Sequence, residues 1–85
     1  MMDVHFPQFE QPATVVAYGD ERIEILAVAA AAPGTPLRGK LEDGEGLELK
    51  VHRCQRTDEG FRIRGRCINL RRAVRQRLEA LFPKS

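Results

Sequence analysis

The stretch that decides the fold is residues 61–67, which read FRIRGRC. Arginine alternates there with apolar or small residues, and a period of two is typical of a strand with one buried face. Residues 47–52 (LELKVH) alternate in the same way, and residues 57–60 (TDEG) between them have the composition of a turn. The sequence therefore predicts a β-hairpin over residues 47–67.

The turn also predicts a register for this hairpin. A three-residue loop over residues 58–60, with Gly60 in the left-handed region, is a common hairpin form. The predicted pairs are Thr57 with Phe61, Gln55 with Ile63, Arg53 with Gly65, and Val51 with Cys67. One face then carries Leu47, Leu49, Val51, Phe61, Ile63 and Cys67. The other carries Lys50, His52, Arg56, Arg62, Arg64 and Arg66. The same parity places Cys54 and Cys67 on opposite faces, which argues against a disulfide between them.

In this register like charges lie directly opposite each other, Arg56 against Arg62 and His52 against Arg66. Each such pair destabilises a sheet by a few tenths to about 1 kcal/mol. We therefore expect acidic side chains nearby: Glu48 on the same face, or Glu24 or Glu42 from a neighbouring strand. A solvated face balanced in this way is one interpretation of the arginines.

An anion-binding face is the other interpretation, because the planar fork of arginine makes paired, charge-assisted hydrogen bonds to phosphate. A nucleic-acid surface would also need aromatic side chains on which bases stack, and Phe61 is the one aromatic residue in this region. The candidate anion or partner face consists of Arg53, Arg56, Arg62, Arg64, Arg66, Arg71 and Arg72.

A helix is predicted over residues 70–82, after Asn69 as its N-cap and before Pro83. Its apolar residues form one stripe: Leu70, Val74, Leu78, Leu81 and Phe82. We expect this stripe to pack against the sheet and to cap an open end or edge.

The first half of the chain predicts further strands. Residues 1–12 show no hydrophobic periodicity and are expected to form an extended arm. Residues 14–28 are predicted to form a hairpin, and residues 37–42 a short strand. The expected fold is all-β to α+β: a small antiparallel β-barrel or curved sheet over residues 13–85, with one C-terminal helix.

Length and charge set further limits. Eighty-five residues make one domain with a thin core. Formation of a homodimer, which would enlarge this core, is therefore an alternative that the sequence leaves open. Residues 1–49 carry three cations and nine acids, and residues 50–85 carry eleven cations and three acids. This division marks a binding surface or two halves that neutralise each other. Neither a signal peptide nor a membrane span is expected, and two cysteines fit free thiols in the cytoplasm.

No combination of residues predicts catalysis. His5 and His52 are isolated, and the hydroxyl side chains do not form a Ser/His/Asp arrangement. Residues 43–46 (DGEG) are too short for a calcium loop. We therefore expect no enzyme, no metal site and no cofactor.

From Ala32 onward the chain resembles the second half of a PilZ domain. The residues that carry the resemblance are 33–37 (PGTPL), the two strands 47–51 and 60–67, and 69–72 (NLRR) opening a helix. The resemblance implies a bacterial cytosolic receptor or adaptor barrel, often bound to cyclic di-GMP. Ligand-binding members carry Arg-x-x-x-Arg before the barrel and Asp/Asn-x-Ser-x-x-Gly on an early strand. Here no arginine precedes Arg22, and residues 24–30 read EILAVAA.

The resulting expectation is a degenerate PilZ-like regulatory or adaptor domain. It would act by protein–protein interaction in bacterial signalling or motility, without binding cyclic di-GMP and without a membrane. Two alternatives stay open: a small barrel that binds nucleic acid or phosphate through its arginines, and a cyclic di-GMP receptor with non-standard arginines.

Overall fold

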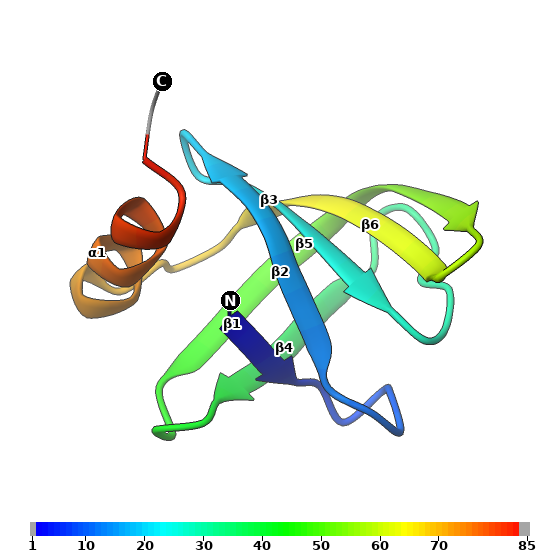
Figure 1. The fold of residues 1–85 in the computed structure, drawn as a ribbon, viewed down its shortest axis with the longest axis horizontal. Coiled ribbons are helices and arrows are strands. Elements are labelled where there is room, and N and C mark those ends of the chain that lie inside the picture. The colour runs from blue at the N-terminus through cyan, green and yellow to red at the C-terminus, as the bar shows by residue number, and fades with distance from the viewer. Residues whose placement is uncertain (1, 84–85) are drawn as a thin grey trace.

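Six strands and one helix make up the computed structural model, which describes residues 2–83 (Figure 1). The elements are β1 (Met2–His5), β2 (Ala13–Gly19), β3 (Arg22–Ala27), β4 (Pro36–Leu41), β5 (Gly46–Thr57), β6 (Gly60–Cys67) and α1 (Arg72–Leu81). The strands form a closed barrel in the order β1-β2-β3-β6-β5-β4, and every neighbouring pair is antiparallel. The expected small antiparallel β-barrel with a C-terminal helix is confirmed.

Strand β1 closes the barrel between β2 and β4. Met2 pairs with Val15, and Val4 pairs with Leu41. The side chains of Met2 and Val4 are buried. The segment expected as an extended arm over residues 1–12 is extended over Met2–His5, but there it is a strand of the barrel wall. The reason is a short alternation in MDVHF (2–6), whose apolar members all point into the core.

Two aromatic side chains complete the core after β1. Phe6 and Phe9 are buried and meet edge to face, with ring centroids 5.8 Å apart and an interplanar angle of 79°. Phe6 lies over Gly39, where a Cβ atom would come within 2.7 Å of the Phe6 ring. Glycine at this position of β4 therefore makes room for the aromatic pair.

The β5–β6 hairpin forms, but the predicted register is wrong. Thr57 pairs with Gly60, so the loop has two residues rather than three. The Thr57 hydroxyl donates to the Gly60 carbonyl oxygen at 3.2 Å and accepts from the Glu59 N–H at 3.3 Å. These bonds favour the tighter turn. Arg56 consequently lies opposite Phe61, not opposite Arg62.

A β-bulge at His52 then moves the register once more. Arg53 pairs with Arg64 and Val51 pairs with Gly65, so His52 is the extra residue. Beyond it Lys50, rather than His52, lies opposite Arg66. The predicted division into faces holds except at Arg56, which lies opposite the half-buried Phe61 and so on the inward side of the hairpin beyond the bulge. Leu47, Leu49, Val51, Ile63 and Cys67 are buried and Phe61 is half-buried, while Lys50, His52, Arg56, Arg62, Arg64 and Arg66 are exposed.

The bulge also overturns the predicted placement of the cysteines. Cys54 lies opposite Ile63, on the same inward side as Cys67. The two cysteines are still free thiols. Cys67 lies four residues along β6 from Ile63, which is about 13 Å and too far for a disulfide.

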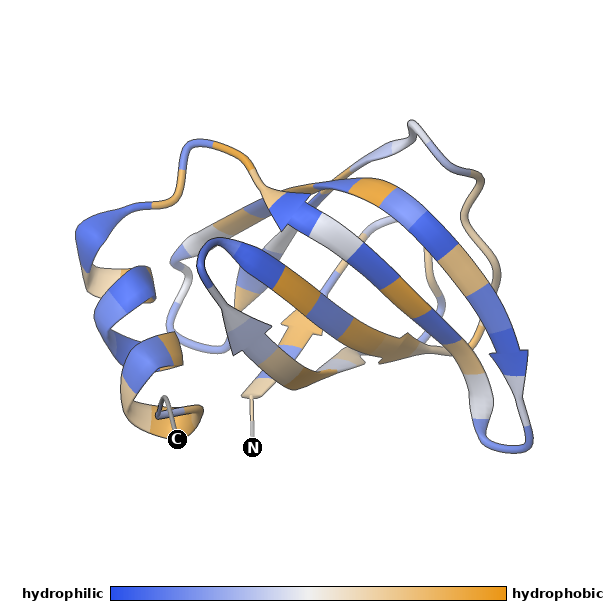
Figure 2. Ribbon diagram, turned by 90° about the horizontal axis from the view of Figure 1, so that it is seen from above, coloured by the Kyte–Doolittle hydropathy of each residue, from blue (hydrophilic) through white to orange (hydrophobic). Residues whose placement is uncertain are grey.

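Helix α1 covers one end of the barrel (Figures 1 and 2). Val74 and Leu78 are fully buried against the strands. Leu70 and Phe82 are half-buried, but Leu81, expected in the same stripe, is exposed. The helix begins at Arg72 rather than at residue 70. Asn69 is not its N-cap, because its φ of 51° lies in the left-handed region and Arg71 takes the cap position without a side-chain hydrogen bond.

Two ion pairs join this helix to turns at the same end of the barrel. The Arg75 guanidinium lies 2.6 Å from the Glu21 carboxylate in the β2–β3 turn. Arg77 pairs with Asp43 in the β4–β5 turn. The helix is therefore attached by a buried apolar contact and by charges on both sides of it.

Candidate functional site

The outer surface of β3, β6 and β5 is strongly basic. We call it the basic face and define it as Arg22, Lys50, His52, Arg53, Arg62, Arg64 and Arg66, all of which are exposed. Because neighbouring strands are in register, these side chains form rows across the strands. Figure 2 shows the alternation of hydrophilic and hydrophobic residues along the strands.

Glu24 on β3 balances part of the basic face. Its carboxylate accepts a hydrogen bond from Arg64 Nε at 2.5 Å, and its second oxygen lies 3.4 Å from Arg62 Nε. The expectation that a neighbouring strand supplies Glu24 is confirmed. Glu48 instead pairs with Arg38, at 3.2 Å. Within residues 2–83 no ion pair involves Glu42, so the compensation expected from it is not found.

Another row has no such balance. Arg22 on β3 lies directly opposite Arg66 on β6, and Arg66 lies directly opposite Lys50 on β5. None of these three side chains forms an ion pair with any residue between 2 and 83. We call this set the cation row. Three adjacent cations repel one another, which makes the row a place where an anion is stabilised.

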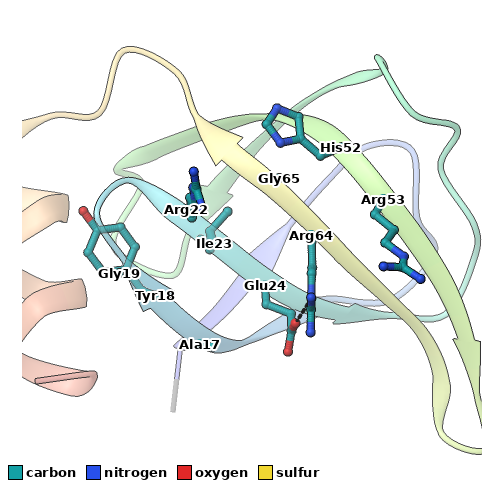
Figure 3. Close-up of a pocket in the computed structure, with 10 residues that line it drawn as sticks. All are labelled: Ala17, Tyr18, Gly19, Arg22, Ile23, Glu24, His52, Arg53, Arg64 and Gly65. Carbon is teal, nitrogen blue, oxygen red and sulfur yellow. Dashed lines mark hydrogen bonds and ion pairs between the residues drawn. The ribbon is translucent and has the colours of Figure 1, made fainter. Parts of the chain in front are cut away.

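A groove of about 520 Å³ crosses the basic face (Figure 3). Backbone at Ile23 and Gly65 forms its floor, and Figure 3 shows Tyr18 near one end and Arg53 near the other. The volume is in the range of small-ligand sites, although the groove is open to solvent. Arg22, Arg53 and Arg64 line it together with Glu24.

The structure brings four of the predicted site residues together: Arg53, Arg62, Arg64 and Arg66. The bulge at His52 places Arg53 outward, opposite Arg64. Arg56 is exposed near the hairpin turn, outside the groove. Arg71 and Arg72 are exposed at the start of α1 and do not line the groove either.

The sequence prediction missed Arg22 and did not place Tyr18 in the site. Arg22 shares a strand with Glu24, two residues away, so both point outward from β3. That parity was visible in the sequence. What was not visible is that β3 pairs with β6, because nothing in the sequence reports which strands of a barrel are neighbours.

A second group of polar residues lies beneath α1, around Cys67. Burial, and to a lesser degree the Glu21 carboxylate, raises the pKa of Cys67 to about 11. Burial also raises the pKa of Tyr18, and the hydrogen bond to Glu21 raises the pKa of Arg75. These shifts keep Cys67 a neutral thiol at neutral pH, so the group attaches the helix and offers no nucleophile.

Between residues 2 and 83, no three His, Cys, Asp or Glu side chains gather as a metal site would require. The one helix in that range is too short and too polar to cross a membrane. No family model, curated protein or solved structure matches the chain.

Proposed function

We propose that this chain is a non-enzymatic, PilZ-like regulatory or adaptor domain whose basic face binds an acidic segment of a partner protein. The resemblance in residues 33–72 and the order of strands followed by a closing helix support the PilZ-like part of the proposal. The family implies a role in bacterial signalling or motility and a cytoplasmic location.

The observation that carries the proposal is the imbalance of charge on the barrel wall. Six cations and one histidine occupy the basic face, and Glu24 is the one acid that pairs with them among the described residues. A groove with one sign of charge concentrates ligands of the opposite sign and speeds their association. An acidic peptide laid along the groove would meet Arg22, Arg64 and Arg53 in turn.

Cyclic di-GMP is not part of the proposal. The residues that hold it in ligand-binding PilZ domains have no counterpart at residues 24–30 or before Arg22. Binding of nucleic acid is the competing function. It would rest on Tyr18, whose ring lies at one end of the groove, as a stacking platform. Phe61 is half-buried against the core as Tyr18 is, but it does not line the groove.

Fluorescence anisotropy with three labelled probes tests the proposal. The probes are a glutamate-rich peptide, a single-stranded oligonucleotide of the same net charge, and cyclic di-GMP. We expect the peptide to bind and the Arg53→Ala/Arg64→Ala variant to lose that binding. The matched control is Arg71→Ala/Arg72→Ala, which removes the same charge away from the groove and should bind as the unchanged protein does.

Two outcomes would overturn the proposal. One is an oligonucleotide that binds more tightly than the peptide and loses affinity steeply between about 50 and 200 mM salt, as phosphate contacts require. This result would favour the nucleic-acid function. The other is a micromolar isotherm with cyclic di-GMP that the Arg64→Ala change removes, which would make the chain a receptor with non-standard arginines.

A further inference from the structure

The cation row of Arg22, Arg66 and Lys50 is built by strand pairing. The three residues occupy directly opposed positions on three adjacent strands, β3, β6 and β5. Opposed residues in antiparallel strands have Cα atoms about 4.5–5.5 Å apart. All three side chains are exposed on the outer side of the wall. Their charged ends can therefore converge on one small group.

The neighbouring row shows how this protein satisfies such charges. There one carboxylate, that of Glu24, lies between Arg62 and Arg64 and contacts both guanidinium groups. One negative charge thus balances two positive charges. The cation row has three positive charges and no carboxylate from residues 2–83 paired with it. By the same proportion, three cations would be matched by a compact group that carries between one and two negative charges.

The row also borders an open space. Arg22 and Arg66, with Gly19 and Asp20, line a hollow of about 420 Å³ at the end of β2 and β3. Gly19 lies directly opposite Arg22, and a Cβ built there meets no atom within 4 Å. The absence of a side chain at Gly19 keeps the space beside Arg22 open, and Asp20 lines the other part of the same hollow.

We propose that the cation row is a binding site for a phosphomonoester dianion, such as a phosphorylated serine or threonine in the acidic partner segment. This inference rests on the proposed function and names the chemistry of its ligand. A phosphomonoester carries about −1.5 to −2 charges at neutral pH and three acceptor oxygens. Arg22 and Arg66 offer paired donors to two oxygens, and Lys50 acts as a point charge on the third.

A pair of matched peptides tests this site. Both have the same acidic sequence, but one carries phosphoserine where the other carries glutamate. We expect the phosphopeptide to bind at least about tenfold more tightly, which corresponds to about 1.4 kcal/mol. Arg66→Ala should remove this preference. Arg66→Lys keeps the charge but loses the planar fork, and should keep part of the preference.

Two further variants separate the site from general charge. Arg62→Ala removes another exposed arginine from the same strand and should weaken both peptides alike, so that their ratio stays unchanged. Gly19→Leu removes no charge but fills the hollow beside Arg22, and should lower the affinity for the phosphopeptide more than for its glutamate counterpart.

Inorganic phosphate, with chloride at the same ionic strength as control, distinguishes the source of the phosphate group. Displacement of the phosphopeptide by millimolar phosphate but not by chloride would support the site and show that the row accepts the free ion as well. Equal affinity for the two peptides would overturn the phosphate site and leave the proposed function standing. Binding of the phosphopeptide without any binding of the glutamate peptide would support the site and contradict a general acidic-segment function.

Discussion

At the scale of single residues, Gly65 determines how closely β5 and β6 approach. A Cβ atom at Gly65 would lie 2.5 Å from the Lys50 carbonyl oxygen and 2.6 Å from a Leu49 methyl carbon. The oxygen belongs to the backbone and cannot move away without disturbing the hairpin. Glycine at position 65 therefore permits the bulged register. That register in turn sets where the side chains of the basic face lie on β5 and β6.

Gly65→Ala should lower the free energy of unfolding by about 1–3 kcal/mol, the usual cost of forcing an extra carbon into a packed site. Urea denaturation followed by circular dichroism measures this change. Gly46→Ala is the matched control, because a Cβ at Gly46 meets no atom within 4 Å. Equal stability of the two variants would contradict the close approach at Gly65.

The raised pKa of Cys67 makes stability depend on pH at the alkaline end. Burial raises this pKa from 9.0 to about 11, so the folded protein holds the thiol proton more tightly than the unfolded chain does. The stabilisation is complete below about pH 9 and is lost as pH rises through about 11. This group alone should account for a loss on the order of 2 kcal/mol.

Urea denaturation at several pH values between about 8 and 11 measures that loss. Cys67→Ala should show a shallower decline than the unchanged protein. Tyr18, whose pKa burial also raises, is present in both proteins, so the difference between the two curves reports the removal of the Cys67 thiol, including its effect on Tyr18. Parallel curves would show that the thiol does not couple folding to pH.

At the scale of elements, the hairpin shows what the sequence could predict. Alternation in residues 47–51 and 61–67 correctly predicts which side chains are buried, because burial depends on the period alone. The bulge was missed because it depends on one residue, His52. Its trace in the sequence is the three-residue spacing between the inward Val51 and the inward Cys54, where strict alternation requires two or four.

The helix shows the same limit at its boundary. Asn69 is suited both to an N-cap and to the left-handed region, and the sequence does not distinguish these uses. The interior of the stripe was predictable, because Val74 and Leu78 lie one turn apart and both are buried. Leu81 lies in the last turn of the helix, where it is 43% exposed.

The helix predicts a contrast between two leucines. Leu78→Ala should destabilise the protein by about 2–5 kcal/mol, because Leu78 is fully buried and its truncation leaves a cavity. Leu81→Ala should change stability by less than about 0.5 kcal/mol, as surface substitutions usually do. Chemical denaturation of both variants checks the contrast. A small effect of Leu78→Ala would mean that the helix does not cap the barrel.

At the scale of the whole molecule, the two oppositely charged halves of the chain meet in the barrel. Glu24 and Glu21 of the acidic half pair with arginines of β6 and of α1, and Asp43 pairs with Arg77. The two halves therefore neutralise each other in part, as the sequence suggests. The remaining positive charge collects on one wall because β3, which carries Arg22, is the neighbour of β6. The order of strands therefore brings cations that lie far apart in the sequence together on one surface of the barrel.

Closure of the barrel depends on β1, which leads to the final prediction. Removal of residues 1–6 would delete the buried side chains of Met2, Val4 and Phe6 and expose the edges of β2 and β4. Unpaired edges favour association between chains. We expect the truncated protein to lose cooperative unfolding in urea and to elute as dimers or larger species in size-exclusion chromatography.

Point variants in β1 distinguish a structural strand from a dispensable arm. Val4→Ala should cost on the order of 2 kcal/mol, because Val4 is fully buried between β2 and β4. His5→Ala, next to it and exposed, should leave the unfolding transition unchanged. A truncated chain that remains monomeric and unfolds with the free energy of the full chain would show that five strands suffice and that β1 merely lies against them.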